Sequence, residues 1–155
     1  MLARAGLQLG APPEAGVLLL GDSGAGKSDV TLRLIQGGAV LVSDDQTELY
    51  ADDAGLMGRA PERLAGLLEI RGVGILQMAR AENARIALCV VLEASPAPRL
   101  PEPAFYDLPQ ELALRDSIRI PLLQVDSREN SAPAKIAAAV AGYGNGKFHN
   151  INGNL

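Results

Sequence analysis

The stretch Gly21-Asp22-Ser23-Gly24-Ala25-Gly26-Lys27-Ser28 matches the pattern G-x-x-x-x-G-K-S and stands directly behind the apolar run Val17-Leu18-Leu19-Leu20. Between a buried strand and a helix, such a loop turns backbone N–H groups around a β-phosphate at the positive end of the helix dipole. We expect Lys27 to reach the β- and γ-phosphates, and the Ser28 hydroxyl to ligate Mg²⁺. An ordinary glycine-rich turn is the alternative, but both flanks favour the binding of a nucleoside triphosphate with Mg²⁺, or of a similar ligand.

Composition limits the classes of protein that this chain can represent. With 155 residues, 48% of them hydrophobic, it is long enough for one full core, and the alternation of apolar runs with helical patterns indicates an α/β domain. The formal net charge is −4 and no basic cluster is present, which argues against a nucleic-acid or anionic-membrane partner. No apolar run is long enough to span a membrane. The lone Cys89 stands in an apolar run and fits a reducing compartment, so we predict a cytoplasmic protein.

Turn signals divide the chain into expected strands and helices. A helix over 29–36 should end at Gly37-Gly38, and a strand over 39–42 should follow, which together with 17–20 makes a right-handed βαβ unit. Residues 1–142 are predicted to form the domain, and the Gly- and Asn-rich segment 143–155 a flexible tail. Further expectations are strands at 5–9, 47–50, 84–92 and 118–125, with an edge or bulge at Pro121, an irregular proline-rich segment at 95–109, and a helix at 134–141.

Two acidic and basic patterns are candidates for chemistry. Asp44 and Asp45 follow the expected strand 39–42, and ligands of open α/β sheets gather at the carboxyl ends of strands. One of the two carboxylates could hold Mg²⁺ or its water while the other accepts a substrate proton; a solvated turn with a helix N-cap is the alternative. Glu69 and Arg71 bracket an apolar residue, which places both charges on one face of a strand, either as site residues or as a surface ion pair at a bulge.

The loop arginines Arg99 and Arg128 are candidates for anchoring a phosphate. Loop arginines are usually solvated, so sequence alone gives them little support. His149, the only histidine, stands in the expected tail and is interpreted as inert.

Three stretches together resemble the HPr serine kinase/phosphorylase family: residues 21–28, Leu-Val-Ser-Asp-Asp at 41–45, and Glu-Ile-Arg-Gly-Val-Gly-Ile at 69–75. The resemblance is to the catalytic domain in a short single-domain form and covers about residues 17–141. It implies a P-loop fold of the phosphoenolpyruvate carboxykinase type, with a mixed sheet, flanking helices and homo-hexameric assembly. It also implies an enzyme that uses ATP to phosphorylate a serine of HPr, the phosphocarrier of the sugar phosphotransferase system. The same enzyme would remove that phosphate with inorganic phosphate and yield pyrophosphate.

The resemblance also implies roles for individual residues. Asp45 is similar to the family's catalytic carboxylate, which accepts the proton of the substrate serine; phosphoryl transfer needs an oriented hydroxyl and a charge clamp more than a strong base. Ser28 and Glu69 look like Mg²⁺ ligands, with Asp45 as a further candidate. Lys27 would stabilise the transferred phosphoryl group. Asp44, Arg71 and Arg99 complete the catalytic candidates.

Two departures from the family pattern concern the reverse reaction. The family's catalytic histidine before the loop has no counterpart in residues 2–9, and its arginine- and proline-rich loop near the C-terminus is replaced by residues 124–129. We therefore predict a kinase whose phosphorolysis is weak or lost. Two alternatives stay open at this point: a P-loop kinase of small metabolites, and a regulatory module that binds nucleotide without turnover.

Overall fold

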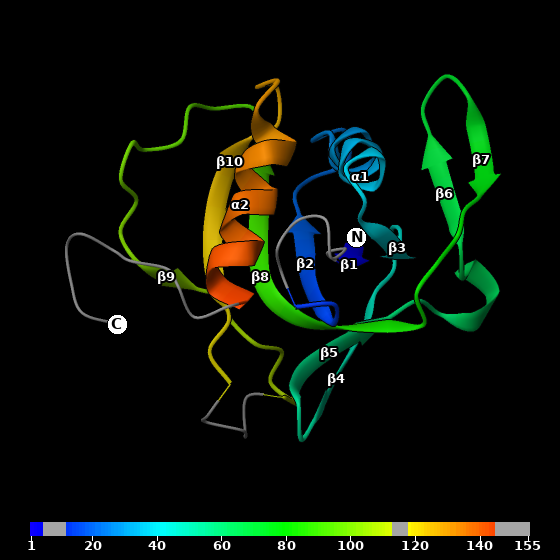
Figure 1. Cartoon of the computed structure of the whole chain (residues 1–155), viewed down its shortest axis with the longest axis horizontal. Coiled ribbons are helices and arrows are strands. Elements are labelled where there is room, and N and C mark those ends of the chain that lie inside the picture. The colour runs from blue at the N-terminus through cyan, green and yellow to red at the C-terminus, as the bar shows by residue number, and fades with distance from the viewer. Residues whose placement is uncertain (5–11, 113–117, 145–155) are drawn as a thin grey trace.

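The computed structural model of the chain describes residues 1–4, 12–112 and 118–144. It contains α1 (Lys27–Gln36), α2 (Ala132–Gly144), a short 3-10 helix η2 (Glu62–Leu64), and strands β1 (Leu2–Arg4), β2 (Ala15–Leu20), β3 (Val40–Ser43), β4 (Glu48–Asp52), β5 (Gly55–Arg59), β6 (Leu67–Ile70), β7 (Gly74–Gln77), β8 (Asn83–Glu93), β9 (Ala104–Phe105) and β10 (Pro121–Asp126). An eight-stranded sheet runs in the order β3-β1-β2-β8-β10-β9, with β5 joined to β8 and β4 to β5 (Figure 1). β6 and β7 form a separate hairpin.

The strand directions bring several carboxyl ends to one edge of the sheet. β2, β8 and β10 run parallel, and β1 runs antiparallel to both β2 and β3. β3 therefore points the same way as β2, and the segments that follow β2, β3, β8 and β10 start from the same edge. The predicted βαβ unit of β2, α1 and β3 is confirmed, with β1 inserted between its two strands. The ends of these strands are where ligands of α/β sheets bind.

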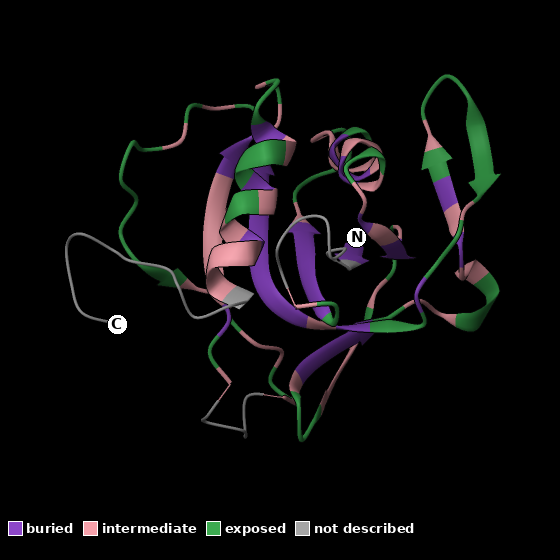
Figure 2. Cartoon of the chain, viewed as in Figure 1, coloured by how far each residue is buried: buried purple, intermediate pink, exposed green. Residues whose placement is uncertain are grey.

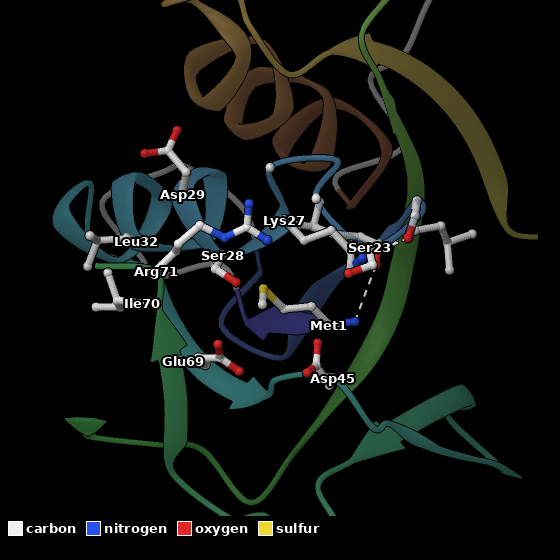
Figure 3. A pocket seen from close by; sticks show the side chains of 15 residues that line it. Met1, Ser23, Lys27, Ser28, Asp29, Leu32, Asp45, Glu69, Ile70 and Arg71 are labelled. Atoms are coloured by element: carbon white, nitrogen blue, oxygen red, sulfur yellow. Dashed lines mark hydrogen bonds between the residues drawn. The ribbon is translucent and has the colours of Figure 1, made fainter. Parts of the chain in front are cut away.

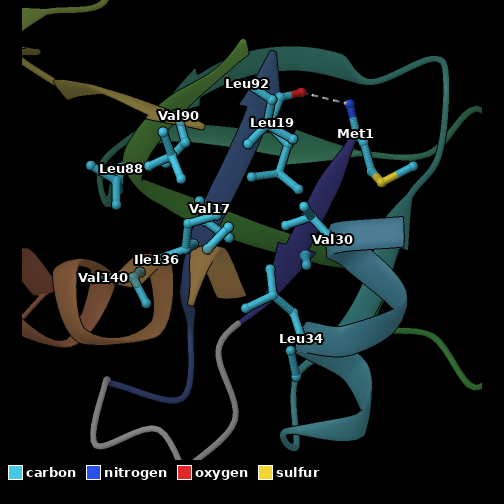
Figure 4. Close-up of a cluster of buried hydrophobic side chains, with 14 of the residues drawn as sticks. Met1, Val17, Leu19, Val30, Leu34, Leu88, Val90, Leu92, Ile136 and Val140 are labelled. Atoms are coloured by element: carbon cyan, nitrogen blue, oxygen red, sulfur yellow. Dashed lines mark hydrogen bonds between the residues drawn. The ribbon is translucent and has the colours of Figure 1, made fainter. Parts of the chain in front are cut away.

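Both α-helices pack on one face of the sheet. Val17 and Leu19 of β2 alternate toward this face, where Val30 of α1 and Ile136 of α2 cover them (Figure 4). The helices also contact each other. Leu19 and Val30 are fully buried, and each such side chain contributes about 1.5–3 kcal/mol through removal from water. The predicted mixed sheet with flanking helices is confirmed, and this packing fixes where α1 begins relative to the sheet.

The opposite face is covered by strands and irregular segments. Leu18 and Ile86 are buried there with Leu56 of β5, and Tyr106 and Ile118 pack at the margin. Cys89 lies in this layer, where burial raises the pKa of its thiol to about 12. The thiol therefore stays protonated and unreactive, as its predicted place in a buried strand requires. Figure 2 shows β8 buried along most of its length between the two layers.

Some sequence-based boundaries were wrong. Pro121 begins β10, which lies between β8 and β9 and is not an edge strand; a strand's first position tolerates a missing N–H. The segment 95–109 contains the short strand β9. Helix α2 runs to Gly144, past the expected end at residue 141. The expected strand at 5–9 and the tail residues 145–155 lie outside the described residues. In the part that the structure describes, no helix is long and apolar enough to cross a membrane.

Candidate active site

The phosphate-binding loop joins β2 to α1 through glycines that no other residue could replace without strain. Gly26, the residue before the helix, has φ +90°, and a Cβ added there would lie 3.2 Å from Cβ of Ser127. Gly21 has φ +142°, and its added Cβ would lie 2.8 Å from the carbonyl oxygen of Leu92. Positive φ values and close neighbours explain why glycine occupies both positions. The loop is thereby wrapped around the N-terminus of α1, where backbone N–H groups are free to bind an anion.

Lys27 closes the loop on itself. Its ammonium group donates hydrogen bonds to the carbonyl oxygens of Gly21, at 2.7 Å, and Asp22, at 2.9 Å. Both bonds are exposed to solvent, so they cost little to exchange for phosphate oxygens. The ammonium group is thus held over the loop, where a bound phosphate would meet it.

A cavity of about 680 Å³ lies in front of the loop. Figure 3 shows the side chains of Ser28, Asp45 and Glu69 directed into it, together with the Arg71 guanidinium. These residues come from α1, from the bend after β3, and from the hairpin β6–β7. Met1, Leu19, Leu20, Gly21, Ser23, Gly24, Gly26, Lys27, Asp29, Leu32 and Ile70 complete the lining. Phosphate-binding and carboxylate groups therefore share one cavity.

Asp44 is not among the residues that line this cavity. Its Oδ2 accepts a hydrogen bond from the backbone N–H of Glu69 at 2.9 Å, which ties the end of β3 to β6. Its Oδ1 is buried and has no hydrogen-bond partner. Burial raises the pKa of this carboxyl, partly opposed by the hydrogen bond from Glu69. Asp44 thus holds the strand that carries Glu69.

The cavity offers oxygen ligands that suit magnesium. The Ser28 hydroxyl and the carboxylates of Asp45 and Glu69 are hard oxygen donors, the type that Mg²⁺ prefers. Among the described residues, no three His, Cys, Asp or Glu side chains are grouped closely enough to hold a metal by themselves. This arrangement fits Mg²⁺, which usually keeps several waters and is bound through one or two carboxylates and the phosphates of the substrate.

Of the other predicted site residues, only Arg71 reaches the cavity. Arg99 is exposed in a bend and does not line the cavity. Arg71 does line it, but from the turn after β6, and the prediction of one strand face for Glu69 and Arg71 was therefore wrong. Arg128 is engaged by Asp126, whose Oδ1 and Oδ2 accept hydrogen bonds from Nε and Nη2 at 3.0 and 2.9 Å. Asp22 and Ala25 belong to the loop but do not line the cavity.

Sequence reasoning did not identify several cavity residues. Met1 and Leu32 contribute to the lining, and Ser127 lies against Gly26. Met1 reaches the site because β1 pairs with β2, and its amino group donates a hydrogen bond to the carbonyl oxygen of Leu19 at 3.2 Å. The side chains of these residues do not indicate phosphate chemistry. They could be assigned to the cavity only once the order of the strands in the sheet was known.

A phosphate-binding loop between β2 and α1, facing carboxylates at the carboxyl edge of a mixed sheet, defines the chain as a P-loop α/β protein. The profile of the family described as "HPr Serine kinase C-terminal domain" matches residues 13–134. The chain belongs to this family.

Relatives and a solved structure agree with this assignment. The chain is 45% identical over 86 residues to HPr kinase/phosphorylase of Streptococcus thermophilus (strain CNRZ 1066), a match that covers 50% of this chain and 28% of the relative. It is 50% identical over 64 residues to HPr kinase/phosphorylase of Limosilactobacillus reuteri (strain DSM 20016), covering 41% and 20%. The chain thus spans less than a third of these relatives. A structure of the Hpr(Ser) kinase/phosphatase from Coxiella burnetii superposes with a TM-score of 0.63 at 26% identity, covering 81% of this chain and 85% of that one.

Proposed function

We propose that this chain is a protein-serine kinase that transfers the γ-phosphoryl group of ATP to a serine of HPr. The observation that carries the proposal is the single cavity that holds Lys27 and Ser28 of the loop together with Asp45 and Glu69. A structural glycine turn would need no carboxylates in front of it. Membership of the family implies nucleotide-dependent phosphorylation, and the names of the relatives supply HPr as the acceptor.

In the proposed phosphoryl transfer, Asp45, Lys27 and Arg71 have different roles. The serine hydroxyl oxygen forms a bond to the γ-phosphorus, the bond from that phosphorus to the β,γ-bridging oxygen breaks, and ADP leaves. Asp45 accepts the hydroxyl proton, which it can do because its exposed carboxylate faces the loop. Lys27 and Arg71 place positive charge beside the transferred group, where negative charge is spread over the equatorial oxygens.

Ser28 and Glu69 are the residues that would hold Mg²⁺, with Asp45 as a further ligand. When bound, the ion neutralises phosphate charge and orients the β- and γ-phosphates. The chain's own contribution is to fix the two carboxylates from different elements. Asp45 follows β3, Glu69 belongs to β6, and the hydrogen bond from the Glu69 amide to Asp44 joins the two elements.

We propose that phosphate-dependent removal of the phosphoryl group is slower than the kinase reaction. Residues 2–9 contain no histidine, and His149 is the only one in the chain. In phosphorolysis, a side chain must accept a proton from the attacking inorganic phosphate. Without the histidine, Asp45 would have to do this alone. Release of pyrophosphate from phospho-HPr at a rate equal to that of phosphorylation would contradict this proposal.

Assembly and location are further parts of the proposal. A homo-hexamer and a cytoplasmic site of action follow from the resemblance to the family and from the HPr partner. Mass photometry of the purified protein tests the first, and fractionation of the cells that express it tests the second. The alternatives of a small-metabolite kinase and a module without turnover are not favoured by the family assignment.

Transfer of a labelled γ-phosphoryl group from ATP to purified HPr in the presence of Mg²⁺ tests the proposed function. We expect one phosphoryl group per HPr, and loss of transfer in Lys27→Ala. Lys135→Ala is the matched control, since Lys135 pairs with Glu129 on the outside of α2, away from the cavity. If wild type binds ATP but labels no HPr, the proposed kinase function is wrong.

A further inference from the structure

Exposed apolar side chains are concentrated on one hairpin. In the part of the chain that the structure describes, the large hydrophobic side chains that stand exposed are Val73 (68%), Ile75 (68%), Leu76 (39%) and Leu100 (54%). All but Leu100 lie within four consecutive positions at the tip and on the second strand of the β6–β7 hairpin. A cluster of large apolar side chains that is exposed to solvent is typical of a surface that binds another molecule.

The hairpin is also a wall of the candidate active site. Glu69, Ile70 and Arg71 line the cavity, and the apolar positions follow directly in the chain. Ile75 stands opposite Glu69 in the antiparallel pair, so the two side chains share one face of the hairpin. The apolar surface is therefore continuous with the rim of the cavity.

The hairpin is anchored at its base and open along its outer strand. Leu68, on the other face, is fully buried in the core between sheet and helices. Figure 1 shows β6 and β7 standing apart from the main sheet, and Figure 2 shows β7 exposed along its whole length. A surface that is held in place before binding loses little conformational freedom when a partner covers it.

We propose that Val73 and Ile75 form a docking surface for the protein substrate, and that its occupant is an apolar patch bordering the acceptor serine of HPr. Leu76 pairs with Leu68 and therefore lies on the opposite face of the hairpin. The inference rests on the proposed function. A serine that reaches Asp45 brings the surrounding surface of a folded substrate against the rim of the cavity. Ser23 and Gly24 of the loop, which also line the cavity, carry no large apolar side chain. Because Ile75 shares a face with Glu69, which lines the cavity, the surface is continuous with the cavity, and this favours the substrate over a second copy of this chain as its occupant.

The double variant Val73→Thr/Ile75→Thr tests the proposal. Threonine keeps the β-branched shape of both residues, so the hairpin should stay folded while its apolar surface is reduced. We expect KM and Kd for HPr to rise at least tenfold, and kcat at saturating HPr and the Kd for ATP to stay within twofold. Leu100→Thr is the matched control, because Leu100 is also an exposed large apolar residue but lies outside the hairpin and the cavity. It should leave all of these values unchanged.

The other outcomes overturn the inference in distinguishable ways. If the double variant binds HPr as tightly as wild type, the docking surface lies elsewhere. If its oligomeric mass falls while its Kd for HPr is unchanged, a second copy of the chain covers the hairpin. If wild type itself neither binds nor phosphorylates HPr, the proposed function fails and the docking proposal fails with it.

Discussion

Asp44 is expected to act on catalysis through Glu69, although it does not line the cavity. Asp44→Ala removes the acceptor for the Glu69 amide, and a hydrogen bond to a charged acceptor is worth about 1.5–3 kcal/mol. The variant also removes a half-buried carboxylate whose pKa is raised by burial, which offsets part of this loss. We therefore expect the free energy of unfolding to fall by only about 1 kcal/mol. Loss of a residue that orients a metal ligand costs roughly 10–100-fold in metal affinity or activity.

Kinase rates measured over a range of Mg²⁺ concentrations test this expectation. For Asp44→Ala, the half-saturating Mg²⁺ concentration should rise about tenfold or more, while urea unfolding shows a small change. Asp44→Asn keeps an acceptor oxygen for the Glu69 amide and should recover much of the Mg²⁺ dependence. Asp29→Asn is the control, because Asp29 lines the cavity but pairs with Arg33 at 2.7 Å on the surface of α1. An unchanged Mg²⁺ dependence in Asp44→Ala would refute the positioning role.

Three further perturbations have definite expected outcomes. Asp45→Asn should lower kcat by roughly 10²–10⁴-fold and leave the Kd for ATP within twofold, measured by transfer kinetics and nucleotide titration; a variant as active as wild type would exclude Asp45 as the proton acceptor. Leu19→Ala empties a fully buried position and should lower the free energy of unfolding by about 2–5 kcal/mol in urea, whereas the exposed Leu100→Ala should change it by less than about 0.5 kcal/mol. Asp126→Asn removes a carboxyl whose pKa is held below its usual value by hydrogen bonds from the Arg128 side chain and backbone. A depressed carboxyl pKa stabilises the fold above about pH 4 and loses this contribution as the pH falls, so the variant's lower Tm at pH 7 should approach that of wild type near pH 2–3; a constant difference would contradict this account.

The parts of the site that depend on local sequence could be predicted. The loop at 21–28 has its glycines, lysine and serine at fixed spacing, and the structure places it between a strand and a helix as expected. Asp45 could be assigned to the same edge because the carboxyl ends of parallel strands meet there, even though β1 separates β2 from β3.

The rest depended on contacts between distant segments. The hydrogen bond from the Glu69 amide to Asp44 joins residues 25 positions apart, and no spacing rule predicts which of two adjacent aspartates faces inward. Arg71 was expected on a strand, but Gly72 at φ +81° helps turn the chain directly after it. The proline-rich segment around Arg99 has no periodicity from which its path could be inferred. The phosphate-binding loop could therefore be predicted from the sequence more fully than the contact between Asp44 and Glu69 or the position of Arg71.

The most direct test of the account is the intact mass of HPr after incubation with this protein, ATP and Mg²⁺. The arrangement of Lys27, Ser28, Asp45 and Glu69 in one cavity predicts a gain of one phosphoryl group, located on a serine by fragmentation of the product. An unchanged HPr mass, with ATP binding intact on the same protein sample, would contradict it.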